Sequence, residues 1–567
     1  MKKYFIIAFT FLGILAFSQN EKAAKTPEKK FIHSEFNNDS KISEELLNKI
    51  GAKNLQNLGL IWGFLKYYHP NVSSGKYNWD DELLKILPKI AGTSDEQRDQ
   101  ILITWIKSFG DFKTKDYPEP KNIKMKADLD WITSYGFTKE LSDLLLAIKK
   151  ADRKKSNYYV SLFSDGNANF ENENPYSTMV SPDAGFRLLS LYRYWNIIQY
   201  YFPYRYAIGE DWKDVLTEFI PKFTSAQDGT EYNLACLELS TKINDSHGGF
   251  FNNVTYHFFG ERIVPLEIVF AENKAVVKNY YDEKLGKETG IKIGDIILEV
   301  NGKTVGKILQ EYSKYIPASN KAVKLRNLSF ILLNSNELTI DVKYLSNGLE
   351  KTVTIPTYRS NEINYTQKPA ESFKMNNGDT AYLHLQNLKS DHLPDIFEKI
   401  KNTKGLVIDI RTYPTDALLF KLAKYIMPKP EIFVDFTVSY PTRPGYFIFA
   451  QKYDVGSNNK DYYKGKIAIL VNETTQSSAE YHTMAFQKAP KAKVFGSQTS
   501  GADGDVSYIP LPGKILTGIS GVGVYYPDGK ETQRIGIIPD VEVKQTIDGI
   551  RNNKDEVLEK ALEWIKN

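Results

Sequence analysis

The feature that most constrains the fold of this chain is an internal repeat in its N-terminal half. The stretch LGLIWGFLKYYHPNV, which begins at Leu58, returns as LLSLYRYWNIIQYYFPYR, and YNWDDELLKILPKI returns as EDWKDVLTEFIPKF. Three pairs of residues keep one register without a gap, each 133 positions apart (203 − 70 for the first): Pro70 and Pro203, Trp79 and Trp212, and Pro88 and Pro221. Such a match predicts a duplicated helical unit. Aromatic residues at helical spacing in both copies predict buried cores, so residues 44–255 are predicted to form a helical lobe.

The two copies of the repeat differ in the loop where each one ends. The first copy ends in Phe-Gly-Asp-Phe-Lys at 109–113, whereas the second ends in Asn-Asp-Ser-His-Gly-Gly at 244–249. An isolated histidine more often has a structural role than a catalytic one. The divergence between the copies, and the glycines that follow, favour a catalytic role for His247.

A second informative stretch lies near the C-terminus and contains Ser477. Lys466–Val471 is a short, apolar, β-branched run that predicts a buried strand, and apolar residues at helical spacing over 479–486 predict a helix after it. Ser477 therefore lies near a helix N-terminus, where unpaired N–H groups and the helix dipole favour negative charge. An acyl-transfer enzyme places its nucleophile and oxyanion hole in such a position. The alternative is that Ser477 is a helix N-cap, a common use of serine. His482, one turn into the helix, is interpreted as structural.

The order of motifs around Ser477 resembles that of the tail-specific (carboxyl-terminal processing) serine peptidase family. The motifs are Ser-Ser-Ala-Glu at 477–480, Ala-Lys-Val-Phe-Gly at 492–496, Thr-Ser-Gly at 499–501 and Gly-Ile-Ile-Pro-Asp at 536–540. The resemblance implies that Ser477 is the nucleophile, that no cofactor is needed, and that residues 376–567 form a crotonase-like αβ peptidase core.

The pattern of secondary structure in this C-terminal region supports an α/β core. Strands are predicted at Thr380–Leu385 and Gly405–Arg411, and helices around Leu393–Ile400, 416–426 and 554–566.

The identity of the catalytic base follows from one departure from the family pattern. Relatives with a Ser-Lys pair carry a lysine after the Thr-x-Gly segment, but Ala-Asp-Gly stands here at 502–504. The loop around His247 resembles the histidine-bearing segment of the tricorn-like branch, in which histidine is the general base. In that branch a glutamate supports the histidine through a serine. The matching position is Gln533, with Glu531 two residues earlier on the same strand face, and Ser246 is the candidate serine.

The oxyanion hole shows a second departure. Relatives usually carry Gly-Gly after the proline of the segment that corresponds to Asp409–Asp416, whereas this chain carries Thr415 and Asp416. Backbone freedom is reduced there. The predicted donors are the N–H of Ser478 and one N–H from Thr415 or Gly501.

Residues 260–357 are predicted to form a β-rich domain. Strands are expected at Val264–Phe270, Lys274–Val277, Ile296–Val300 and Glu337–Tyr344, and Asn301-Gly302 is a hairpin turn signal. The segment Thr289–Gly302 resembles a PDZ domain, which implies that a protein tail binds by strand addition. The alternative is a spacer or regulatory module with a blocked groove.

The remaining features limit location and partners. Residues 1–18 have a basic tip, a short apolar core and a small-residue exit, a pattern that predicts a signal peptide and export to the periplasm or the medium. The polar, aperiodic residues 19–43 are predicted to form a flexible leader. No other stretch approaches the length of a membrane span.

A net charge of +4 predicts no nucleic-acid partner. The single cysteine, Cys236, excludes an internal disulfide and a cysteine zinc cluster and is predicted to be buried. Metal and nucleotide motifs are absent from the sequence, and the oligomeric state stays open.

The sequence thus predicts an exported α/β multidomain serine endopeptidase that acts on proteins or peptides, with a helical lobe, a PDZ-like domain and a peptidase core. In this hypothesis Ser477 attacks the scissile carbonyl and His247 transfers the proton. The competing hypothesis is a non-catalytic relative that holds peptides without cleaving them.

Overall fold

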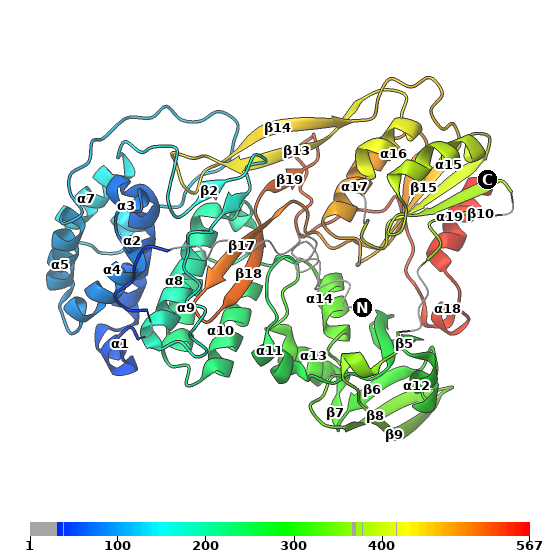
Figure 1. Cartoon of the computed structure of the whole chain (residues 1–567), viewed down its shortest axis with the longest axis horizontal. Coiled ribbons are helices and arrows are strands. Elements are labelled where there is room, and N and C mark those ends of the chain that lie inside the picture. Colours follow the sequence, from blue (N-terminus) through cyan, green and yellow to red (C-terminus); the bar gives the residue numbers. More distant parts are fainter. Residues whose placement is uncertain (1–30, 38, 366–369, 377, 415–416) are drawn as a thin grey trace.

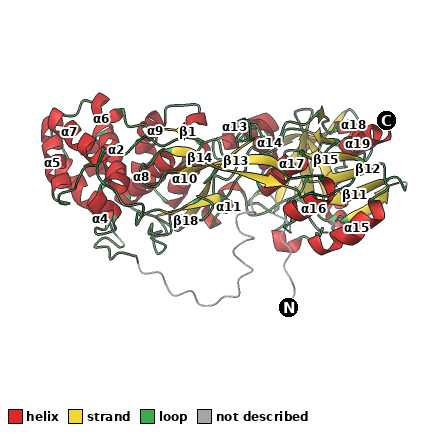
Figure 2. Ribbon diagram, turned by 90° about the horizontal axis from the view of Figure 1, so that it is seen from above, coloured by secondary structure: helices red, strands yellow, loops and turns green. Residues whose placement is uncertain are grey.

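The computed structural model describes residues 31–37, 39–365, 370–376, 378–414 and 417–567. The predicted signal peptide lies outside these residues. The mixed α/β multidomain architecture is confirmed: helices gather at one end of the molecule and most strands at the other (Figures 1 and 2). Within the described residues, no helix combines the length and the apolar character needed to cross a membrane.

The N-terminal lobe is built around two long helices, α2 (Ala52–Tyr68) and α8 (Ala184–Tyr201), at the left of Figure 1. The shorter α-helices that complete it, among the residues that the structure describes, are α1 (Glu44–Ile50), α3 (Pro70–Ser73), α4 (Trp79–Ile86), α5 (Asp95–Lys107), α6 (Trp131–Ser134), α7 (Lys139–Lys149), α9 (Trp212–Thr224), α10 (Gly229–Thr241) and α11 (Asn253–Phe259). Three short strands, β1 (Ile123–Met125), β2 (Ser161–Leu162) and β3 (Ala168–Asn169), lie between them in the chain. Cys236 is buried in α10, as predicted.

The same tryptophan pair occurs in both copies of the repeat. In the first copy the indole N–H of Trp62 donates to the Trp79 carbonyl and the indole of Trp79 donates to the Trp62 carbonyl, both at 2.9 Å. In the second copy Trp195 and Trp212 exchange the same two bonds at 2.6 and 3.0 Å. The rings stack with centroids 6.4 and 6.2 Å apart. Each long helix is therefore tied to the helix that begins with the second tryptophan of its pair, α2 to α4 and α8 to α9, by one repeated, buried contact.

The close approach of α2 to α8 depends on glycine, because a Cβ on Gly63 would lie 1.8 Å from Asn196 Oδ1. Asn196 cannot move freely, since its amide donates to the carbonyls of Gly59 and Tyr192. We expect Gly63→Ala to lower the free energy of unfolding by about 3 kcal/mol in urea titrations. The control is Gly306→Ala, at a helical position with nothing within 4 Å, which should stabilise slightly through helix propensity. Equal effects of the two substitutions would contradict this account.

The segment before α1 differs from the prediction of a flexible leader. In its described part, the Ser34 hydroxyl donates to Asp81 at 2.6 Å, and the Ser40 N–H donates to Asp183 at 2.7 Å. Both serines are buried. This polar stretch is held by two side-chain carboxylates of the lobe, which hydrophobic periodicity does not reveal.

The β-rich domain follows the lobe and contains one antiparallel sheet in the order β4-β5-β6-β8-β9. Its elements are β4 (Leu266–Ala271), β5 (Lys274–Tyr280), β6 (Ile296–Val300), β7 (Lys303–Thr304), β8 (Thr339–Ser346), β9 (Leu349–Pro356), α12 (Glu283–Glu288), α13 (Val305–Ser313) and α14 (Lys321–Ser329). The four predicted strands are confirmed, with ends shifted by three residues at most. Asn301 and Gly302 have positive φ angles of 49° and 74°, as a hairpin turn requires. The strand-based prediction missed α13 and α14.

The C-terminal core contains a mainly parallel sheet in the order β10-β11-β12-β15-β16-β20, in which only β10 runs antiparallel to its neighbour. The strands are β10 (Phe373–Asn376), β11 (Thr380–His384), β12 (Gly405–Asp409), β15 (Lys466–Val471), β16 (Ala492–Gly496) and β20 (Val541–Glu542). Helices α15 (Leu393–Ile400), α16 (Leu419–Ile426) and α17 (Ser478–Phe486) share one apolar cluster with the sheet, and α19 (Glu556–Lys566) packs in another. A short α18 (Ile547–Arg551) precedes α19.

Two hairpins join the core to the lobe. The first, β13 (Glu431–Ser439) and β14 (Phe447–Val455), pairs with β19 (Gly523–Tyr525) on one side and with β1 of the lobe on the other. The second, β17 (Val506–Leu511) and β18 (Ile515–Ser520), lies beside α8 and α10 in Figure 1. Because both hairpins reach the lobe, they bring the end of the second repeat close to the core.

Candidate active site

Ser477 occupies a strained turn between β15 and α17. Its φ and ψ angles are 55° and −122°, a combination that is costly for any residue with a side chain. The surrounding structure holds the turn, because the Ser477 N–H donates to the Ala502 carbonyl at 2.9 Å. A sharp strand-to-helix turn of this kind presents a serine hydroxyl above the sheet, and Ser477 is half-buried rather than enclosed.

The carboxylate of Glu480 organises the loops around Ser477. It accepts the N–H of Gly501 at 2.7 Å, that of Ala502 at 3.1 Å, that of Ser477 at 3.2 Å and the hydroxyl of Thr499 at 2.5 Å. Burial raises the pKa of Glu480, and these hydrogen bonds oppose that effect. One side chain thus fixes both the turn at Ser477 and the loop at 499–502 that faces it.

His247 lies in the loop after α10 and is buried, with 4% of its surface exposed. Its Nδ1 is 2.9 Å from Ser520 Oγ in β18. Ser520 donates its hydroxyl to Asp245 Oδ1 at 3.0 Å and its N–H to Asp245 Oδ2 at 2.6 Å. Burial lowers the pKa of His247, and the negative charge of Asp245 opposes this.

The structure differs from the prediction for the residues that orient His247. Ser246 Oγ is 2.9 Å from Ser319 Oγ instead. Glu531 accepts hydrogen bonds from Lys124 at 2.9 Å and from Tyr206 at 2.8 Å. The amide of Gln533 is buried and has no hydrogen-bond partner among the described residues. The physical reason is that β18 faces the histidine loop, whereas Gln533 lies in a turn whose described hydrogen bonds do not reach that loop.

Of the three N–H groups predicted as oxyanion donors, those of Ser478, Thr415 and Gly501, only that of Ser478 lies in the described residues without a partner in its own helix. Ser478 is the first residue of α17, where an N–H group has no partner within the helix. The N–H of Gly501 already donates to Glu480, which removes Gly501 as a donor. Thr415 lies outside the described residues. The sequence analysis missed Tyr413, whose pKa is raised by burial and lowered by hydrogen bonds to the side chains of Ser478 and Ser477.

Ser477 and His247, the predicted nucleophile and base, do not share a hydrogen bond within the described part of the chain. His482, interpreted as structural, is buried, with Nδ1 2.6 Å from the Ser478 carbonyl.

A segment of the β-rich domain, residues 319–326, contacts both the loop that carries His247 and the loops on either side of Ser477. We call this segment the brace. Ser319 contacts the histidine loop through Ser246, as described above. The amide of Asn320 donates to the carbonyls of Thr499 and Ser500 at 2.9 and 3.1 Å. Arg326 then reaches the loop before Ser477.

Arg326 donates to the Glu473 carbonyl at 2.7 Å and to Gln476 Oε1 at 3.0 Å. Burial lowers its pKa to about 10. Through the brace, the β-rich domain touches the histidine loop, the loop before Ser477 and the loop at 499–500.

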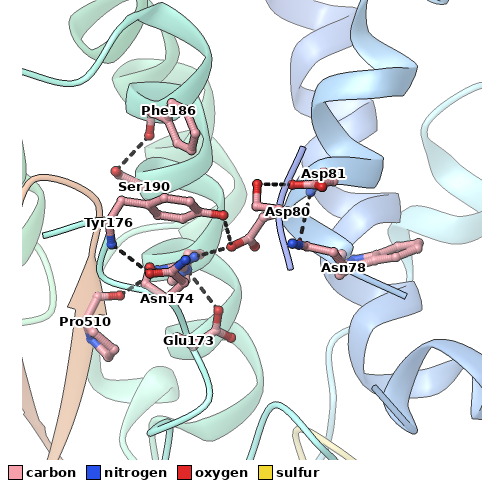
Figure 3. A network of polar contacts seen from close by, with 12 residues as sticks. Asn78, Asp80, Asp81, Glu173, Asn174, Tyr176, Phe186, Ser190 and Pro510 are labelled. Atoms are coloured by element: carbon pink, nitrogen blue, oxygen red, sulfur yellow. Dashed lines mark hydrogen bonds and ion pairs between the residues drawn. The ribbon is translucent and has the colours of Figure 1, made fainter. Parts of the chain in front are cut away.

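A buried ionic network supports the second hairpin from within the lobe (Figure 3). Arg193 binds Asp80 at 2.6 Å and Glu173 at 2.9 Å, and Glu173 also binds Lys66 at 2.6 Å. Arg193 also donates to the Pro510 carbonyl in β17 at 2.9 Å. Because β17 pairs with β18, this network helps to fix the strand that carries Ser520.

The tip of the first hairpin is held by the lobe in a similar way. The Tyr68 hydroxyl donates to the Pro444 carbonyl at 2.5 Å, and Arg153 donates to the Thr442 carbonyl at 3.0 Å. The N–H of Gly445 donates to the Tyr200 carbonyl at 2.9 Å. The lobe and the core are thus joined by buried polar contacts on both hairpins.

Comparison with known proteins adds to this geometry. Residues 379–543 match the model of peptidase family S41. The S41 region therefore includes Ser477, the strained turn and the brace contacts of the core. A carboxy-terminal-processing protease of Bartonella bacilliformis is 24% identical over 296 residues, which cover 50% of this chain and 61% of that protein. A probable CtpA-like serine protease of Staphylococcus aureus is 25% identical over 280 residues, covering 47% and 50%.

The chain spans about half to three-fifths of the length of these curated relatives. Among solved structures, mature CPAF complexed with lactacystin is similar with a TM-score of 0.52 at 14% identity, covering 68% of this chain and 98% of that one. Mature CPAF alone gives 0.51 at 13% identity, covering 68% and 97%. These likenesses concern the fold. The S41 match and the relatives' names together indicate a family of serine-type peptidases.

Proposed function

We propose that the protein is a serine endopeptidase in which Ser477 is the nucleophile and His247 the general base. The observation that carries the proposal is the strained turn at Ser477, because strain of this kind persists only where the surrounding structure enforces it and gathers at functional sites. Its position within the S41 region supports the same conclusion.

The proposed mechanism follows ordinary acyl transfer. Ser477 Oγ attacks the scissile carbonyl while His247 Nε2 takes the hydroxyl proton and then delivers it to the leaving amine as the C–N bond breaks. Water, activated by the same imidazole, hydrolyses the acyl-enzyme. The Ser478 N–H and the Tyr413 hydroxyl are the donors proposed for the oxyanion, since both lie beside Ser477. The lowered pKa of His247 favours the neutral base near neutral pH.

Ser477 and His247 must approach each other when substrate binds, because no hydrogen bond joins them in the described structure. Catalytic hydrogen bonds are often long in the free enzyme and shorten in the complex. The missing hydrogen bond between Ser477 and His247 also favours the second candidate, a relative that binds peptides without cleaving them. The test below separates the two.

The proposed substrates are proteins or peptides, and the proposed location is the periplasm or the medium. The β-rich domain offers an edge strand, β4, at one side of its sheet. An extended peptide tail can add to such an edge, as in PDZ domains. We therefore propose that this domain engages substrate tails.

Labelling with a fluorophosphonate probe tests the function. We expect the folded wild-type protein to be labelled, and Ser477→Ala and His247→Ala to lose labelling by about 1,000-fold or more. His257→Ala is the matched control, since His257 lies in α11 with an exposed side chain, and it should label normally. Undiminished labelling of Ser477→Ala would place the nucleophile elsewhere. A folded wild-type protein that does not label would favour the peptide-binding candidate.

A further inference from the structure

We infer that Asp245 and Ser520 form a positioning pair that orients His247 and stabilises its protonated form. The inference rests on the proposed function, because it concerns the base of that reaction. It assigns this role to a carboxylate from the same loop as the histidine and to a serine from β18. Neither the glutamine nor the glutamate near the Gly-Ile-Ile-Pro-Asp motif takes part.

The hydrogen-bond directions define the tautomer of the imidazole. Asp245 is fully buried. Its carboxylate accepts the backbone N–H of His247 at 3.0 Å, and it also accepts the backbone N–H and the hydroxyl of Ser520. A carboxylate can only accept, so the single hydroxyl proton of Ser520 goes to Asp245. The oxygen of Ser520 is then left as an acceptor for His247 Nδ1–H, at 2.9 Å. With the proton on Nδ1, the lone pair is on Nε2, which is the atom that must take the proton from Ser477.

The charge of Asp245 acts on the same ring. Asp245 Oδ1 is 3.8 Å from His247 Nδ1, and no water-exposed surface separates the two, since both residues are buried. An opposite charge at this distance favours the protonated imidazole, whereas burial disfavours it. The carboxylate therefore counters part of the burial effect and stabilises the imidazolium that forms during attack.

The strand that carries Ser520 is packed tightly against the histidine loop. A Cβ on Gly518 would lie 2.7 Å from the His247 carbonyl oxygen, so β18 approaches the backbone of His247 itself. The ionic network of Figure 3 fixes the partner strand β17 through Arg193. Ser520 is consequently held on a rigid element, as a positioning residue requires.

The test is the pH dependence of fluorophosphonate labelling, measured between about pH 4 and about pH 9 with the fold checked by circular dichroism. We expect Asp245→Asn and Ser520→Ala to label about 100-fold more slowly at neutral pH. We also expect the midpoint of the acid limb to fall by about one pH unit in Asp245→Asn, because loss of the negative charge lowers the pKa of His247, and to fall in Ser520→Ala, because Nδ1–H loses its acceptor. A purely structural defect would slow labelling at every pH and leave the midpoint in place.

Two further variants sharpen the test. Ser520→Thr keeps the hydroxyl and should keep the wild-type midpoint. Ser507→Ala is the matched control, because Ser507 is a buried serine of the same hairpin that donates to Asn167 and to the Ala168 carbonyl instead. It should leave the midpoint unchanged. Unchanged midpoints in Asp245→Asn and Ser520→Ala, both folded, would overturn the inference while the Ser477 and His247 variants still upheld the proposed function.

A second measurement does not depend on activity. The chain has seven histidines, and the ring signal of His247 can be identified by its loss in His247→Ala. NMR titration of that ring should give a pKa about one unit lower in Asp245→Asn than in the wild type. An identical pKa in the two proteins would overturn the inference even if the wild-type protein did not label at all.

Discussion

Replacing Glu480 by glutamine is expected to remove activity and to lower the free energy of unfolding by about 3 kcal/mol. Each carboxylate oxygen accepts two donors: Oε1 accepts Thr499 and Gly501, and Oε2 accepts Ser477 and Ala502. Glutamine keeps one acceptor and turns the other into an N–H₂ group that faces two of these donors. The buried N–H of Gly501 or that of Ala502 then loses its acceptor, and the turn that strains Ser477 loses part of its support.

The measurements are urea unfolding and fluorophosphonate labelling of the same sample. We expect labelling to fall by at least about 100-fold under conditions in which the variant is still folded. Glu559→Gln, at an exposed position in α19, is the control for loss of a helical carboxylate and should change neither quantity. A Glu480→Gln protein with wild-type labelling would show that the strained turn does not need this carboxylate.

Replacing His69 by phenylalanine is expected to make the protein markedly less sensitive to acid. His69 is fully buried at the end of α2, and neither ring nitrogen has a hydrogen-bond partner among the described residues. Burial lowers its pKa from 6.5 to about 4. The neutral ring is therefore favoured in the folded state. This contribution to the free energy of unfolding is fully present above about pH 6.5 and is lost as the pH falls toward about 4, where the loss amounts to about 3 kcal/mol.

The second copy of the repeat supplies the control for this experiment. Phe202 occupies the position that corresponds to His69, since 202 − 69 gives the same offset of 133. Phe202 is also buried, so Phe202→His should introduce a similar sensitivity to acid. Unfolding by urea at pH 7 and at about pH 4 measures both effects. If His69→Phe and the wild type lose the same free energy of unfolding between the two pH values, His69 is not the titrating group.

Local features of the fold could be predicted from the sequence. The strand Lys466–Val471, the helix Leu393–Ile400 and the strand Ile296–Val300 have the predicted bounds, because each shows its periodicity within a few residues. The analysis missed the β13–β14 hairpin, although its aromatic and β-branched residues flank a turn with two prolines and a glycine. That region carries none of the family's motifs, and its strands are recognised only by their pairing in the structure.

The partners of His247 could not be predicted, because they depend on contacts between distant segments. Asp245 was visible two residues from the histidine, but its role depends on Ser520, which is 273 residues away from His247 in the chain. The resemblance pointed to Ser246 and to the strand near Gln533. Only the packing of β18 against the histidine loop shows that another serine lies closer.

The brace has a consequence for when the protein becomes active. The histidine comes from the lobe, the serine from the core, and Asn320 and Arg326 of the β-rich domain hold the loops on both sides of the serine. Under the proposed function, a nascent chain that has folded only two of these three parts lacks the base, the nucleophile or the support of the nucleophile. If the protein is the proposed peptidase, we expect hydrolysis to begin only after the whole polypeptide has folded, which would protect neighbouring proteins from premature cleavage during synthesis.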